Sequence, residues 1–140
     1  GGGCPGRPEG RDATGQALCQ GRAAGEGTRD DRRRTGDGTG GNWLSIEDAQ
    51  GWRYNYGHIN NDTPGTDDGA NPAAFRFAPG IVPGAHVRAG QFVAYMGDSG
   101  EAETTAPHLH FEVHRPDDSF IDPYTSLRLS QGAGANGLCA

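Results

Sequence analysis

The sequence His108-Leu109-His110-Phe111-Glu112-Val113-His114 alternates polar and apolar side chains. Because successive side chains of a β-strand point to opposite faces, this stretch predicts a strand with one apolar and one polar face. The apolar face, formed by Leu109, Phe111 and Val113, should lie against a core. The polar face gathers several imidazoles, which are groups that bind metals or transfer protons.

Two aromatic segments upstream of this strand predict a β-hairpin. Trp43-Leu44-Ser45-Ile46 and Trp52-Arg53-Tyr54-Asn55-Tyr56 are rich in residues that favour strands, and a polar turn separates them. Residues 60–80 are rich in Asn, Asp, Pro and Gly and predict a long loop. Short strands punctuated by glycine follow in residues 81–97, and no segment has the pattern of an amphipathic helix. The sequence therefore predicts a small all-β domain over residues 42–127.

Residues 1–41 differ sharply in composition from the predicted domain. They hold 13 of the 25 glycines, and Leu18 is their only large aliphatic side chain. Such a segment cannot bury enough apolar surface to offset the entropy lost on ordering, so we expect it to be disordered or aberrant and to supply no strands. Residues 128–140 are rich in small side chains and predict a flexible tail.

The charge balance and the cysteines narrow the possible functions. The formal net charge is -6 at pH 7, which disfavours electrostatic binding of nucleic acid. No apolar run approaches the ~20 residues that a membrane span needs. The chain has no lysine, which excludes a biotinyl or lipoyl carrier because these carriers attach their cofactor to lysine. The three cysteines lie in the flanking segments and support no disulfide framework: Cys4, Cys19 and Cys139.

Four phrases that occur in order along residues 41–125 resemble the lysostaphin-type, or LytM-like, zinc endopeptidases. They are Trp52-Arg53-Tyr54-Asn55-Tyr56-Gly57-His58, Val87-Arg88-Ala89-Gly90-Gln91, Tyr95-Met96-Gly97-Asp98-Ser99-Gly100 and Ala106-Pro107-His108-Leu109-His110-Phe111-Glu112. The resemblance implies a compact antiparallel β-sheet domain with an open groove. It also implies hydrolysis of peptide cross-links or stem peptides of bacterial peptidoglycan, outside the cell or in the cell envelope.

The resemblance assigns roles to individual residues. His110 resembles a zinc ligand, and His58 and His108 resemble the catalytic histidines that handle the proton or hold the developing negative charge. A zinc ion would lower the pKa of a bound water toward ~7 and polarise the scissile carbonyl. Tyr56 is a further candidate, for substrate binding as an aromatic residue that lines the groove; packing in the core is the simpler interpretation of such a side chain.

The chain departs from the family pattern upstream of His58. The family takes two further zinc ligands from a His-x-x-x-Asp motif, whereas no histidine precedes His58 in this chain. Because a catalytic zinc site usually has three protein ligands, we expect an incomplete zinc site and impaired hydrolysis. A shifted reading frame or a mis-joined upstream segment would produce this pattern. The alternative function is a non-catalytic LytM-like module that binds cell wall or activates another cell-wall hydrolase.

The remaining candidates have simpler interpretations. His86 is expected to face solvent. His114 lies four positions beyond His110, which at ~3.3 Å per residue is roughly 13 Å, too far to share one ion. Glu112 is either a hydrogen-bond partner of His110 or a structural carboxylate. Three carboxylates lack the spacing of an EF-hand and are interpreted as solvated loop acids rather than calcium ligands: Asp62, Asp67 and Asp68.

Overall fold

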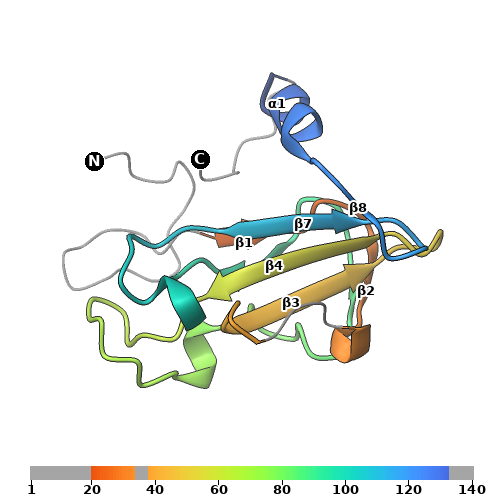
Figure 1. Cartoon of the computed structure of the whole chain (residues 1–140). Coiled ribbons are helices and arrows are strands. Elements are labelled where there is room, and N and C mark those ends of the chain that lie inside the picture. Colours follow the sequence, from red (N-terminus) through yellow and green to blue (C-terminus); the bar gives the residue numbers. More distant parts are fainter. Residues whose placement is uncertain (1–19, 34–37, 133–140) are drawn as a thin grey trace.

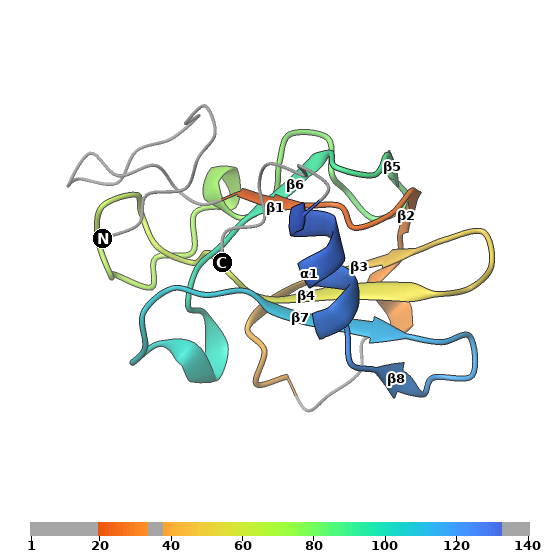
Figure 2. The same ribbon diagram turned by 90° about the horizontal axis from the view of Figure 1, so that it is seen from above.

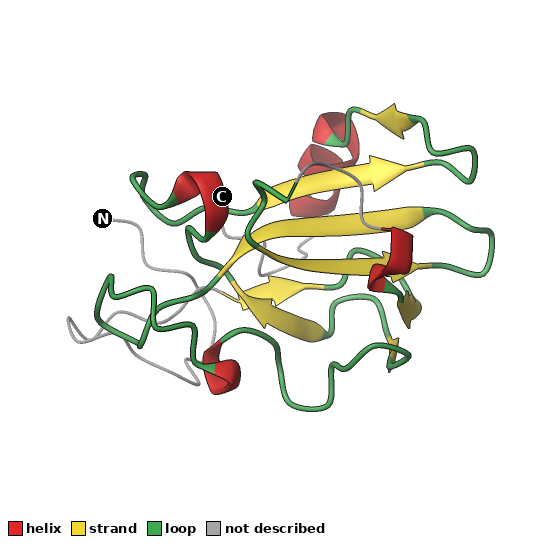
Figure 3. Cartoon of the chain, turned by 60° about the horizontal axis from the view of Figure 1, so that its bottom comes forward, coloured by secondary structure: helices red, strands yellow, loops and turns green. Residues whose placement is uncertain are grey.

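The structure, a computed structural model, describes residues 20–33 and 38–132. Most of its regular elements are antiparallel strands, joined by loops that carry short 3-10 helices (Figures 1 and 3). The strands are β1 (Gln20–Arg22), β2 (Gly27–Arg29), β3 (Asn42–Glu47), β4 (Arg53–Ile59), β5 (His86–Val87), β6 (Phe92–Tyr95), β7 (His110–His114) and β8 (Phe120–Ile121). The helices are η1 (Asp31–Arg33), η2 (Ala73–Phe75), η3 (Gly100–Ala102) and α1 (Tyr124–Gly132).

Two antiparallel sheets build the domain. The larger sheet has six strands in the order β5-β2-β3-β4-β7-β8, and the smaller sheet pairs β1 with β6. The smaller sheet lies behind the larger one in Figure 1, and Figure 2 shows it along one side. Buried apolar side chains from both sheets form one core, which includes Leu44 and Ile46 of β3, Val87 of β5 and Val93 of β6. The predicted all-β fold is therefore confirmed.

The predicted hairpin and its alternation of faces are also confirmed. Leu44 of β3 lies opposite Tyr56 of β4, which in turn lies opposite Phe111 of β7. All three side chains belong to the core or pack against it. The intervening residues therefore point to the opposite face of the sheet, where Ser45 and Asn55 lie side by side.

The expectation that residues 1–41 supply no strands is wrong for residues 20–29. β1 pairs with β6, and β2 lies between β3 and β5. The prediction considered only the apolar side chains of the segment itself. These strands are instead held by backbone hydrogen bonds to neighbouring strands, and they cover the side chains of those neighbours. At Gly27 an added Cβ would lie 2.4 Å from the carbonyl oxygen of Glu47, so the small residue permits this close pairing. Residues 1–19 and 34–37, and all three cysteines, lie outside the described residues.

A C-terminal helix was not predicted, yet α1 runs across the expected boundary between residues 127 and 128 and stands away from the sheet on the side of β7 and β8 (Figure 1). Its start has a capping signal in the sequence. The Asp122 Oδ1 atom accepts a hydrogen bond from the Tyr124 N–H at 2.9 Å, and Pro123 between them suits the first turn. Within the described residues, no helix has the length and apolar character needed to cross a membrane.

Candidate functional site

Side chains along β4 alternate between the two faces of the sheet, but the backbone conformation at His58 breaks this alternation. By alternation, His58 would point to the core with Tyr54 and Tyr56. Its φ of 55° is instead in the left-handed region, which is uncommon for a residue with a side chain. The ring packs beside His108 and His110, with ring centroids 4.9 Å and 5.7 Å away. The structure therefore brings the three histidines of the predicted site together.

Gly97 links the backbones of two of these histidines. Its N–H donates to the carbonyl oxygen of His58, and its own carbonyl accepts from the N–H of His108, both at 2.9 Å. An added Cβ on Gly97 would lie 2.4 Å from the Cα atom of Asn60, so only glycine permits this approach. The antiparallel bridge between Gly97 and His108 therefore sets the distance between His58 and His108.

Each of the three imidazoles is fixed through one ring nitrogen. The Nδ1 atom of His58 lies 2.7 Å from the carbonyl oxygen of Ser99, and Nδ1 of His108 lies 3.0 Å from that of Ala106. Since a carbonyl oxygen can only accept, these contacts assign the proton to Nδ1 and leave Nε2 without it when the ring is neutral. His58 is buried, whereas His108 and His110 are exposed, so the cluster opens to solvent.

Glu112 bridges two histidines on β7. Its Oε1 atom lies 2.7 Å from Nε2 of His110, and its Oε2 atom lies 2.7 Å from Nε2 of His114. The contact with His110 leaves Nδ1 of that ring as the nitrogen available to a metal. The Nδ1 atom of His114 lies 3.3 Å from the carbonyl oxygen of Asp118, so both ring nitrogens of His114 have partners and the residue has a structural role.

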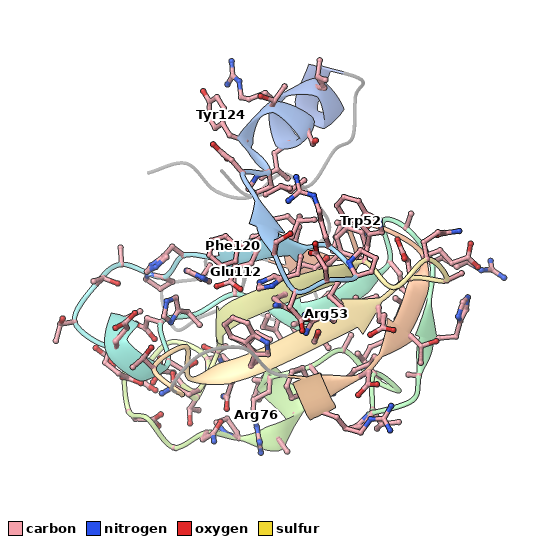
Figure 4. All side chains as sticks on the ribbon, turned by 45° about the vertical axis from the view of Figure 1, so that its right-hand side comes forward. Trp52, Arg53, Arg76, Glu112, Phe120 and Tyr124 are labelled. Carbon is pink, nitrogen blue, oxygen red and sulfur yellow. The ribbon has the colours of Figure 1, made fainter. Side chains whose placement is uncertain are left out.

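A chain of polar contacts supports Glu112 across three strands. The Ser45 hydroxyl donates to Oδ1 of Asn55 at 2.7 Å, and Nδ2 of Asn55 lies 3.4 Å from Oε2 of Glu112. Burial raises the pKa of Glu112, but hydrogen bonds from His110, His114 and Asn55 oppose this effect, and the net pKa lies below its usual value. In Figure 4, Glu112 is labelled on β7, and Arg53 is labelled on the neighbouring β4.

Tyr56, which the sequence assigned to substrate binding, does not lie on the surface. Its side chain is 1% exposed and packs on Phe111, with ring centroids 5.2 Å apart. Its hydroxyl accepts a hydrogen bond from the backbone N–H of Ala24 at 2.8 Å. Because both the ring and the hydroxyl have partners inside the protein, Tyr56 is a core residue, and the substrate-binding assignment is wrong.

Ser99 is a site residue that the sequence did not identify. Its carbonyl holds His58, and its hydroxyl donates to the carbonyl of Ile59 and accepts from the N–H of Asn42 at 3.0 Å. In the sequence, Ser99 is part of the phrase formed by residues 95–100, and no local pattern links it to β3 and β4. His86, by contrast, is exposed as expected, with its Nε2 atom 2.9 Å from Oε1 of Glu26.

The loop carboxylates differ from their interpretation as solvated acids. Asp67 and Asp68 are exposed, but Asp62 is buried and lies with Asp67 and Asp98 in one cluster. Within the described residues, this is the only group of three or more His, Cys, Asp or Glu side chains with ligand atoms close enough for one metal ion. The three histidines of the site do not form such a group.

Comparison with known proteins identifies the fold. Residues 76–123 match the model of peptidase family M23. The catalytic domain of the antimicrobial peptidase lysostaphin from Staphylococcus simulans superposes with a TM-score of 0.54 at 20% identity, over 88% of this chain and 90% of that one. A putative glycyl-glycine endopeptidase lytM from Ruminococcus gnavus gives a TM-score of 0.58 at 23% identity, over 83% of this chain and 44% of that one.

Whole lysostaphin gives a TM-score of 0.55 at 20% identity, and the match covers 96% of this chain and 52% of that one. No curated protein matches the sequence. The described part of the chain therefore has the β-rich fold of the lysostaphin catalytic domain, and the segment that matches the peptidase family model contains two of the three clustered histidines, His108 and His110.

Proposed function

We propose that this chain is a peptidase-type domain directed at the peptide part of bacterial peptidoglycan, with impaired hydrolysis. The observation that carries the proposal is the cluster of His58, His108 and His110, in which each ring is anchored through one nitrogen. The match of residues 76–123 to a peptidase family and the lysostaphin fold support it. Such a domain would act outside the cell or in the cell envelope.

His58 and His108 are the proposed acid–base and oxyanion-stabilising residues. With Nδ1 committed to a carbonyl oxygen, the neutral ring has a lone pair at Nε2 that can accept a proton from water. The protonated ring can in turn donate a hydrogen bond to a negatively charged oxygen. Since His58 is buried and His108 is exposed, substrate would reach the pair from the side of His108.

The described residues do not complete a catalytic zinc site. His110 can offer Nδ1, but a catalytic zinc usually has three protein ligands. Two upstream carboxylates that could have served are engaged elsewhere: Asp31 lies 2.6 Å from Nη2 of Arg29, and Asp30 lies 2.6 Å from Nη2 of Arg32. We therefore expect weak zinc binding through His110 and a low but detectable rate of hydrolysis.

The incomplete ligand set favours one second candidate function. In that case the domain is a non-catalytic LytM-like module, which binds cell wall or activates another cell-wall hydrolase. Such a module keeps the fold and the open groove that the resemblance implies, without needing a bound metal.

The test uses the whole chain and purified peptidoglycan. It measures three quantities: soluble peptide released, zinc bound per protein, and protein that sediments with the wall material. The impaired enzyme should release a trace of peptide that disappears in His58→Ala, His108→Ala and His110→Ala. The matched control, His86→Ala, removes an exposed histidine outside the cluster and should keep the wild-type signal.

The outcomes separate the two functions. Sedimentation with the wall and no peptide release by the wild type would support the binding module and overturn the enzyme. Stoichiometric zinc with rapid release would show that the site is complete and would overturn the impairment. If the protein neither sediments with the wall material nor releases peptide, the assignment to peptidoglycan is overturned.

A further inference from the structure

Three carboxylates from distant parts of the chain meet beside the loop that follows β4. Asp62 and Asp67 lie in that loop, and Asp98 lies in the turn after β6. Each provides one carboxylate oxygen, and the three oxygens lie within 4.8 Å of one another. Asp62 and Asp98 are only 7% and 5% exposed, whereas Asp67 is exposed, so the cluster is open on the side of Asp67.

Asp98 is buried in this cluster with one oxygen unsatisfied. Its Oδ1 atom is buried and has no hydrogen-bond partner. Within the described part of the chain, the ion pairs do not involve Asp62, Asp67 or Asp98. A buried carboxylate oxygen without a donor or a cation is unfavourable, and native proteins usually satisfy such groups.

The fold holds the two buried carboxylates in place. Oδ1 of Asp62 accepts the N–H of Gly69 at 2.8 Å, and its carbonyl accepts Nδ2 of Asn60 at 2.8 Å. Gly97 packs directly on the backbone of Asn60, which brings the turn that carries Asp98 against the end of β4. The tertiary structure, rather than loop sequence alone, therefore creates the cluster.

Burial, followed by the negative charges of Asp62 and Glu103, a hydrogen bond with Asp62 and the negative charge of Asp67, raises the pKa of Asp98 to about 6. Near neutral pH three carboxylates therefore face one another without a balancing charge.

We propose that Asp62, Asp67 and Asp98 bind one divalent cation and that the cation is calcium. The donors are all oxygens, which hard cations such as calcium prefer, whereas zinc favours nitrogen and sulfur ligands. Calcium binds oxygen at about 2.3–2.6 Å, so that ligands on opposite sides of the ion lie about 4.6–5.2 Å apart. The spacing of the three oxygens fits within this span. Water can complete the coordination on the exposed side.

The proposed calcium site is separate from the histidine cluster but adjoins it in the sequence. Asp98 precedes Ser99, whose carbonyl holds Nδ1 of His58. A cation bound to Asp98 would therefore stiffen the turn that orients His58. The cation site does not depend on the proposed peptidase activity, because it is defined by its own residues.

The test uses the whole chain after treatment with EDTA and removal of the chelator. Calcium binding is measured by isothermal titration calorimetry, and stability by thermal unfolding with and without calcium. The wild type should bind one calcium ion and unfold at a higher temperature with calcium. Asp98→Asn and Asp67→Asn should bind calcium at least about tenfold more weakly, because each removes a charged ligand, and should lose the rise in unfolding temperature.

Glu101→Gln is the matched control, because it removes one exposed negative charge near the turn without touching the cluster. It should bind calcium as the wild type does. Asp67→Asn changes an exposed residue, so this variant tests the site even if Asp98→Asn fails to fold. The proposal is overturned if calcium does not stabilise the wild type, or if it stabilises wild type and both Asn variants equally. Equal or tighter binding of magnesium would overturn the assignment to calcium.

Discussion

The imidazole rings of His58 and His108 lie 4.9 Å apart although fifty positions separate them in the sequence. Gly97 holds this pair, since it donates to the carbonyl of His58 and accepts from the N–H of His108. The left-handed backbone of His58 completes the arrangement by turning its ring away from the core. The geometry of the pair thus depends on backbone contacts more than on the side chains themselves.

Gly57→Ala should destabilise the domain beside the histidine cluster. A Cβ at this position would lie 2.7 Å from Cζ3 of Trp43 and 3.3 Å from Cβ of His110. Overpacking of this kind costs about 1–3 kcal/mol in the free energy of unfolding. Urea denaturation followed by tryptophan fluorescence measures it. Gly21→Ala is the control, because its new Cβ would meet only the Ala94 carbonyl, at 3.4 Å. Equal stability of the two variants would contradict the packing at Gly57.

Glu112→Gln should destabilise the protein at neutral pH by about 1–3 kcal/mol, because two histidines lose a charged hydrogen-bond partner. The pKa of Glu112 is lowered in the folded state, so its contribution is present above the ordinary pKa of 4.5 and is lost as the pH falls through the folded value. The difference in unfolding free energy between wild type and variant should therefore shrink in acid.

The control for Glu112 is Glu26→Gln, which alters an exposed glutamate–histidine pair. The Oε1 atom of Glu26 lies 2.9 Å from Nε2 of His86, a distance similar to those that Glu112 makes. Exposed ion pairs contribute little, so this variant should match the wild type. A difference between wild type and Glu112→Gln that stays constant from neutral pH into acid would show that Glu112 does not stabilise the fold through its charge.

Arg29→Ala should reveal how far β2 stabilises the fold. The Arg29 guanidinium pairs with Asp31 at 2.6 Å and lies 4.0 Å from the centroid of the Phe77 ring, and its side chain is 8% exposed. Its loss should cost about 2–4 kcal/mol in unfolding free energy, somewhat less than a fully buried pair because Asp31 is partly exposed. Chemical denaturation gives this value.

Arg32→Ala is the matched control for Arg29, because Arg32 makes a pair of the same length with Asp30 while its side chain is 88% exposed. This variant should unfold with the wild-type midpoint. If Arg29→Ala also left the midpoint unchanged, residues 20–29 would not be part of the cooperative fold.

The stability of the metal-free protein should change with pH as Asp98 gains or loses its proton. Its folded pKa of about 6 lies above the ordinary value of 3.8, so the folded state keeps this proton to higher pH than the unfolded state. Stability from this group is therefore greatest in acid and falls as the pH rises from about 4 to about 6. In EDTA, the unfolding temperature of wild type relative to Asp98→Asn should fall over this interval. A relative unfolding temperature that rises or stays flat would contradict the raised pKa.

The sequence predicted the central strands because their signal is local. The alternation in β7 and the aromatic pattern of β3 and β4 follow from which side chains face the core, and the structure confirms them. The sequence did not predict β1 and β2, because these strands depend on pairing with their neighbours: Gly21 and Gly27 have no apolar side chain of their own. The capping pair Asp122-Pro123 was present in the sequence, yet the helix after it was missed.

The sequence predicted which histidines belong to the candidate site, but it did not predict how they are arranged in space. The order of motifs pointed to His58, His108 and His110, which the structure brings together. The same reasoning assigned Tyr56 to substrate binding, although its hydroxyl accepts a hydrogen bond inside the protein. It also considered the loop carboxylates without Asp98, which lies in another turn.

By itself the sequence determined the face that each central strand turns to the core, because side chains alternate along a strand whatever its neighbours are. It also determined that no histidine stands upstream of His58. Only the tertiary structure decided that His58 leaves that alternation, and that Asp98 meets Asp62. These features depend on a left-handed backbone and on contact between segments far apart in the chain, and neither leaves a periodic signal in the sequence.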